Sequence, residues 1–148
     1  MSEGSGAPRP IVRPLDAEPS RISPQTRFIG YCEVHDVATA LQSAQELEVN
    51  ALYFEAGARA RPHRHNKDQI ILFMDGPGMI AVDGGDDQPV QAGEFVMLPA
   101  GVPHMHGAPS TGPAVHISIM PRDHDSDFDC PIPPVWEHWR RQDQPSGD

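Results

Sequence analysis

The sequence has few cysteines, few basic residues and no long apolar run. A chain of 148 residues is large enough to fold without a disulfide, and its two cysteines suit a reducing compartment. We therefore assign structural roles to Cys32 and Cys130. Eleven basic residues stand against 21 acidic ones, for a formal charge of −10, which argues against nucleic acid and anionic membranes as partners. Because no stretch approaches ~18 apolar residues and no secretory signal is visible, we expect a cytoplasmic protein without a membrane segment.

The chain is nevertheless rich in proline and histidine, with 17 and 8 residues respectively. Its length suits one domain that buries a core of its own. Composition divides it into a Pro-rich N-terminal arm at 1–26, a central domain at 27–121 and an acidic linker with a short helix at 122–148. The prolines of the arm allow neither a helix nor a central strand to persist. It is either a flexible tail or an extended segment laid along a partner subunit.

Short apolar runs separated by Gly, Pro and Asp clusters fill the central domain. This pattern is typical of strands joined by tight turns. Many short strands at even spacing predict an all-β sandwich or small barrel. Residues 36–48 form at most a turn of helix or a loop. The predicted strands lie within the runs 28–34, 51–56, 69–74, 78–83, 94–99 and 114–120.

The C-terminal segment contains a helix-start signal. Pro134 fits the first turn of a short helix, and Trp136 and Trp139 share one of its faces. We expect this pair to pack on its own domain, with a subunit contact as the alternative. We also expect the chain to form a homodimer.

Four of the histidines, together with Gln69, fall in two turn-rich segments. On a strand, side chains two residues apart share a face, so His63 pairs with His65, and His104 pairs with His106. Two such strands would bring three or four imidazoles to one point. Gln69 keeps the parity of His65, unless residues 66–68 bulge and reset it.

The spacing of these residues resembles the two motifs of the cupin family. The first motif is a Gly, five residues, His-x-His, a Glu and a later Gly; the second is a Gly, five residues, Pro-x-Gly, two residues and a His. The sequence departs from the pattern at Gln69, where Glu is usual, and at Ala108, where a distal Asn is usual. The matching residues are Gly57, His63, His65, Gln69 and Gly76, then Gly93, Pro99, Gly101 and His104.

The resemblance implies a single cupin barrel, a jelly roll or double-stranded β-helix, with a short C-terminal helix. It also implies a divalent transition metal, with Mn or Fe favoured and Zn, Ni or Cu possible. Gln69 in place of Glu would leave the full ionic charge at the site and favour anionic ligands. The alternative is a cupin that has lost its metal and keeps a polar pore. The implied ligands are His63, His65, Gln69 and His104.

A narrower resemblance is to small single-domain bacterial cupins, the group that includes manganese-dependent hydroxynitrile lyases and quercetin-dioxygenase-like proteins. It assigns His106 to the substrate pocket and His116 to proton transfer as general base or acid. We expect the other histidines, His35, His124 and His138, at the surface. By strand parity, the further substrate-lining candidates are Asn50, Leu52, Phe54 and Met120.

These features predict a metal-dependent enzyme that acts on a small oxygenated or aromatic compound. Its reaction is either that of a dioxygenase or that of a lyase or isomerase. The alternative from another class is a non-catalytic cupin that binds a metal or small molecule as a sensor or accessory protein. An interaction module acting through the Pro-rich arm is the last possibility.

Overall fold

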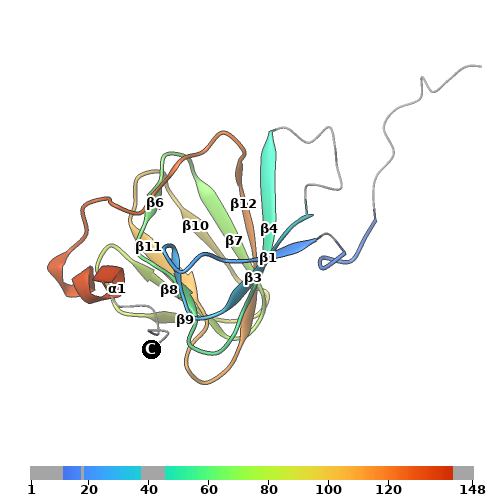
Figure 1. Cartoon of the computed structure of the whole chain (residues 1–148), viewed down its shortest axis with the longest axis horizontal. Helices are drawn as coiled ribbons and strands as arrows, with labels where there is room; N and C mark the ends of the chain where they lie inside the picture. The colour runs from blue at the N-terminus through green and yellow to red at the C-terminus, as the bar shows by residue number, and fades with distance from the viewer. Residues whose placement is uncertain (1–11, 18, 38–45, 142–148) are drawn as a thin grey trace, which may run out of the picture.

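The protein is built almost entirely of short β-strands (Figure 1). The computed structural model describes residues 12–17, 19–37 and 46–141, so most of the segment 36–48 lies outside the described residues. Every predicted apolar run contains a strand. The strands are β1 (Ser20–Ile22), β2 (Phe28–Ile29), β3 (Cys32–Asp36), β4 (Leu47–Phe54), β5 (Arg59–Ala60), β6 (Arg64–His65), β7 (Gln69–Asp75), β8 (Gly78–Val82), β9 (Gln88–Val90), β10 (Phe95–Leu98), β11 (His104–Gly107), β12 (Ala114–Pro121) and β13 (Ser126–Asp127).

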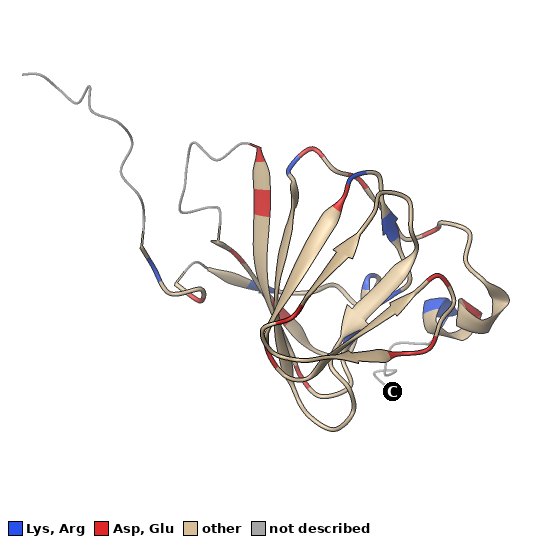
Figure 2. Cartoon of the chain, turned by 180° about the vertical axis from the view of Figure 1, so that it is seen from behind, with Lys and Arg blue, Asp and Glu red and all other residues tan. Residues whose placement is uncertain are grey.

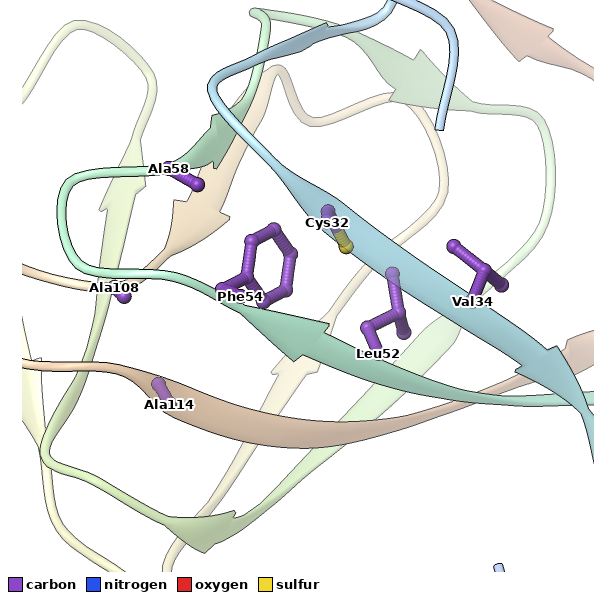
Figure 3. Close-up of a cluster of buried hydrophobic side chains, with 7 residues drawn as sticks. All are labelled: Cys32, Val34, Leu52, Phe54, Ala58, Ala108 and Ala114. Carbon is purple, nitrogen blue, oxygen red and sulfur yellow. The ribbon is translucent and has the colours of Figure 1, made fainter. Parts of the chain in front are cut away.

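The strands form two main antiparallel sheets that pack against each other. One has the order β1-β3-β4-β12-β7-β10 and the other β2-β5-β11-β8-β9, while β13 and β6 form a separate pair. In the interior, Ile71 and Phe73 of the first sheet pack against Ile80 and Val90 of the second. A second buried cluster contains Phe54 (Figure 3). The all-β prediction is confirmed.

The register of β4 and β12 decides which of their side chains face the interior. His116 pairs with Leu52, Ser118 with Asn50 and Met120 with Glu48. Because side chains alternate along a strand, all six project to the same face of the sheet. This face carries the side chains that line the candidate site.

Part of the expected arm joins the barrel. Strand β1 pairs with β3, and Arg21 lies opposite the inward-facing Val34. Proline is tolerated beside this strand because β1 is at the edge of its sheet. Residues 1–11 and Glu18 lie outside the described residues.

After β13 the chain ends in a 3₁₀ turn, η2 (Pro134–Trp136), and the helix α1 (Glu137–Arg141). Neither is long enough to span a bilayer, and the described residues contain no other helix that is. The indole of Trp136 is buried among Met79, Ala81 and Met105 and donates a hydrogen bond to the Gly85 carbonyl at 3.1 Å. The prediction that the tryptophans pack on their own domain is confirmed.

The outer face of the six-stranded sheet is apolar along β7, β10 and β12. Strands β10 and β12 carry no charged residue, and Figure 2 shows the charges gathered at strand ends and in loops. Phe95 is 64% exposed, Met97 48% and Met74 51%. In the described part of the chain, no element covers these side chains.

Candidate metal centre

The two histidine segments lie side by side, as predicted. His63 and His104 form an isolated bridge in which each backbone N–H donates to the other's carbonyl, at 3.2 and 2.8 Å. Their rings lie 4.3 Å apart between centroids. The turn before His104 requires glycine at Gly101, which has φ 88° and donates its N–H to the His65 carbonyl at 2.8 Å. This turn fixes the second segment to the first.

Backbone carbonyls fix the tautomers of His63 and His104. The Nδ1 atom of His63 lies 2.6 Å from the Arg61 carbonyl, and that of His104 lies 3.0 Å from the Val102 carbonyl. A carbonyl only accepts, so Nδ1 carries the proton in both rings. The Nε2 atom of each is left with its lone pair, which is the arrangement of a metal-binding histidine.

His65 and Gln69 are oriented in the same way by side-chain hydroxyls. Ser126 Oγ lies 2.9 Å from His65 Nδ1, and the Gln69 amide nitrogen donates to Ser118 Oγ at 2.9 Å. His65 Nε2 and Gln69 Oε1 are buried without hydrogen-bond partners, as is His104 Nε2. Buried polar atoms are rarely left unpaired, so this donor set fits a divalent transition metal.

His106 adds another possible donor. The nitrogen atoms of His63, His104 and His106 lie within 4.8 Å of one another. His63 and His104 therefore belong both to this group and to the set implied by the motifs. The Nδ1 atom of His106 has no hydrogen-bond partner, so nothing fixes its tautomer as the carbonyls do for the other two.

Burial keeps the imidazoles of this cluster neutral. It lowers the pKa of His65 to about 3 and that of His104 to about 4. It also holds the pKa values of His63 and His106 well below the usual 6.5, and repulsion between neighbouring rings adds to the effect. Near neutral pH the lone pairs are available to a metal rather than occupied by protons.

The cluster opens into a cavity of about 270 Å³. Four of the expected substrate-lining residues line it, and the fifth, Phe54, does not. The Phe54 ring, labelled in Figure 3, is 2% exposed. Its centroid lies 5.7 Å from that of the His106 ring. The four that line it are His106, Asn50, Leu52 and Met120.

His116 points inward, as predicted, but does not line this cavity. Its side chain is fully buried between the rings of Phe54 and Phe73, at 4.7 and 4.2 Å between centroids. Burial lowers its pKa to about 3. Strand parity gives the side of the sheet but not the depth in the barrel, and here the His116 ring is packed against Phe54 and Phe73, outside the lining of the cavity.

Sequence reasoning missed the contribution of the segment that follows β12. His124, Ser126 and Phe128 line the cavity, and Phe128 stacks on His63. The expectation that His124 is a surface residue is wrong, because its side chain is 11% exposed and its ring lies 5.4 Å from that of His65. The signal that could have revealed the segment is the spacing of two between these three residues.

The other two histidines expected at the surface differ from each other. His138 is exposed. The expectation for His35 is wrong: it is 5% exposed, its ring packs on Tyr53, and its Nε2 lies 2.8 Å from a Glu33 carboxylate oxygen. Both cysteines are free and buried, and burial raises the pKa of Cys32 to about 12, which agrees with structural roles.

Comparison with known proteins places this site in a family. Residues 52–120 match the model of the cupin domain. A cupin-like protein from Thermotoga maritima has a similar structure, with a TM-score of 0.70 and 25% identity over 90% of this chain and 98% of its own. The chain belongs to the cupin superfamily. Within the cupin, the match covers β5 to β11, most of β12 and the last three residues of β4, and it includes every candidate metal ligand.

Two further relatives are more distant. The polyketide cyclase RemF from Streptomyces resistomycificus shares the cupin fold, with a TM-score of 0.62 and 16% identity over 72% of this chain and 77% of its own. A gentisate 1,2-dioxygenase from a Ralstonia species is 27% identical over 64 residues, which are 43% of this cupin. The aligned part is 18% of that dioxygenase, so the resemblance covers a small part of it.

Proposed function

We propose that this cupin is a metal-dependent enzyme that acts on a small oxygenated or aromatic compound. The observation that carries the proposal is the set of buried donor atoms without protein partners, His65 Nε2, His104 Nε2 and Gln69 Oε1. Together with His63 Nε2 they would hold the metal. Imidazole donors suit manganese, iron, zinc, nickel and copper, and we favour manganese or iron.

When bound, the metal supplies Lewis acidity at the substrate oxygen. The chain's own contribution is proton transfer and orientation. His106 lines the cavity, whereas His116 does not. We therefore assign the proton transfer to His106, rather than to His116 as the sequence suggested. His116 lies behind it at 5.5 Å between ring centroids and supports its position.

Two ligand sets are distinguished by a pair of substitutions. If His65 is a ligand and His106 moves the proton, His65→Ala loses the metal, whereas His106→Gln keeps the metal and loses turnover. If the metal lies among His63, His104 and His106, His106→Gln loses the metal, whereas His65→Ala keeps it. Metal content per chain is measured by elemental analysis of each variant beside the unaltered protein.

The reaction class is tested with metal-loaded protein and a panel of catechols, diketones and cyanohydrins. Oxygen consumption that depends on the substrate identifies a dioxygenase, for which the similarity to a gentisate 1,2-dioxygenase is support. Turnover without oxygen identifies a lyase or isomerase, which agrees with the resemblance to hydroxynitrile lyases. Tight binding of a small molecule without turnover would instead support the sensor or accessory role.

We also propose that two copies associate through the apolar outer face of the six-stranded sheet. A symmetric dimer needs a patch that complements itself, and an uncharged apolar surface meets that need. The exposed side chains of Phe95 and Met97 on β10 and Met74 on β7 would be covered in such a pair.

A further inference from the structure

Two arginines of the cupin stand out because no carboxylate among the described residues pairs with them. Arg21 and Arg27 make neither an ion pair nor a guanidinium hydrogen bond with the described residues. Most other described basic side chains meet a carboxylate, as Arg59 does with Asp87 at 2.6 Å, or a backbone carbonyl, as Arg140 does with that of Cys130 at 2.7 Å. In a chain with a formal charge of −10, an arginine without a carboxylate partner is unexpected.

Both arginines line the cavity that leads to the histidine cluster. Arg21 projects inward from β1 because it lies opposite Val34, which also lines the cavity. The guanidinium of Arg27 lies 5.1 Å from the centre of the Phe128 ring. That contact orients the guanidinium but leaves its N–H groups for another partner.

The other charged groups of the cavity do not neutralise the arginines. The one carboxylate among the lining residues is Glu48. One of its oxygens accepts a hydrogen bond from the Asn50 amide at 3.2 Å and lies 3.6 Å from His124 Nε2. The lining thus contains two arginines but only one carboxylate, and a carboxylate on a ligand would supply the second negative charge.

The rest of the lining is apolar and partly aromatic. The apolar residues that line the cavity beside the arginines and histidines include Phe28, Val34, Leu52, Met120 and Phe128. A guanidinium holds a carboxylate in a planar fork, whereas the apolar walls suit a hydrocarbon body. The lining of the cavity therefore combines groups suited to an anion, apolar walls and groups suited to a metal.

We propose that the substrate is a small monocarboxylate with an apolar or aromatic body, held by Arg21 and Arg27 so that its far end reaches His63 and His106. This assignment rests on the proposed function, which supplies the reacting end of the cavity. It adds the chemical class of the substrate and the two residues that select it. The carboxylate binds at the arginine end whether or not the metal is present.

The test measures binding to chelator-treated protein by calorimetry at low ionic strength. The probes are benzoate, phenylacetate and butyrate, with benzamide as the uncharged counterpart of benzoate and inorganic phosphate as a competing anion. We expect benzoate or phenylacetate to bind more tightly than benzamide. Arg21→Gln and Arg27→Gln should each weaken carboxylate binding about tenfold, since a charge-assisted hydrogen bond is worth roughly 1.5 kcal/mol.

Arg141→Gln is the matched control, because Arg141 pairs with Glu137 on α1, away from the cavity, and the substitution should leave binding unchanged. Thermal unfolding of each variant confirms that the fold is kept, as expected for exposed arginines. The proposal is overturned if no carboxylate binds, if benzamide or phosphate binds as well as benzoate, or if neither Arg21→Gln nor Arg27→Gln weakens binding. Metal content is measured separately, so carboxylate binding by a chain that takes up no metal would contradict the proposed function alone.

Discussion

The ring of Phe128 lies flat against the ring of His63, with centroids 4.6 Å apart and planes inclined by 15°. Two residues earlier, Ser126 contacts His65 Nδ1. A segment that follows the cupin motifs in sequence thus holds two of the candidate metal ligands from outside. The pairing of β13 with β6 brings it there, with Ser126 opposite His65.

Removing the hydroxyl that orients His65 should weaken metal binding without unfolding the protein. Groups that hold a metal ligand from behind are worth about 10–100-fold in affinity. We therefore expect Ser126→Ala to lower the metal affinity by roughly tenfold, measured by competition with a chelator. Ser110→Ala, at an exposed serine, is the control. Equal affinity in the two variants would show that Ser126 does not position His65.

Replacing the neutral ligand by a charged one tests the electrostatic role of Gln69. Gln69→Glu keeps the shape and the Ser118 contact but adds a negative charge to a buried position. An anion that binds the loaded site should then bind more weakly, because the charge of the ion is partly neutralised. Azide titration followed by spectroscopy measures the change, and unchanged azide affinity would contradict this prediction.

The buried histidines should make the metal-free protein sensitive to acid. Their folded pKa values lie below the unfolded value of 6.5, at about 3 for His65 and His116 and about 4 for His104. Below pH 6.5 the unfolded chain therefore binds more protons, and stability falls. The loss approaches about 1.4 kcal/mol per pH unit for each such histidine.

The stability that the neutral histidines contribute is fully present above their pKa in the unfolded chain. It is lost progressively as the pH falls toward their pKa values in the folded protein. Urea unfolding between pH 7.5 and pH 5 (~2.5 units, enough to resolve the linkage) should show the decline. His116→Phe, which removes a titrating ring among aromatic neighbours, should reduce the slope. A stability that stays constant or rises on acidification would contradict the neutral state of these rings.

The apolar sheet face predicts a homodimer that one charge disrupts. Phe95→Lys places an ammonium at the centre of the exposed patch on β10 and should shift the molar mass from dimer to monomer in light scattering. The matched control is Val135→Lys, at a residue of similar exposure, 61% against 64%, in η2. A monomeric unaltered protein, or a dimer that tolerates Phe95→Lys, would show that this face does not join two copies.

The strands that fall in the six apolar runs could be predicted from the sequence because these runs are bounded by Gly, Pro and Asp turns. The meeting of His63 with His104 could be predicted from motif spacing and parity. The depth of His116 could not, because it depends on how its ring packs between those of Phe54 and Phe73.

The site role of residues 124–128 also escaped prediction. The acidic composition of this segment is that of a solvated linker, and only pairing with β6 turns its alternate side chains toward the cavity. Arg21 lies in the Pro-rich segment that the sequence predicts as an arm, and only the pairing of β1 with β3 turns it toward the cavity. Pairing over two or three residues with a distant strand leaves almost no trace in the local sequence.

The most direct test of the account is the metal content of the protein. Elemental analysis of protein purified without an added metal or a histidine tag should find a transition metal stoichiometric with the chain. His104→Ala should lose the metal, while His138→Ala, at an exposed histidine, should keep it. Protein that contains no transition metal and takes up none from manganese, iron or zinc solutions would contradict the central claim, as would equal metal content in the two variants.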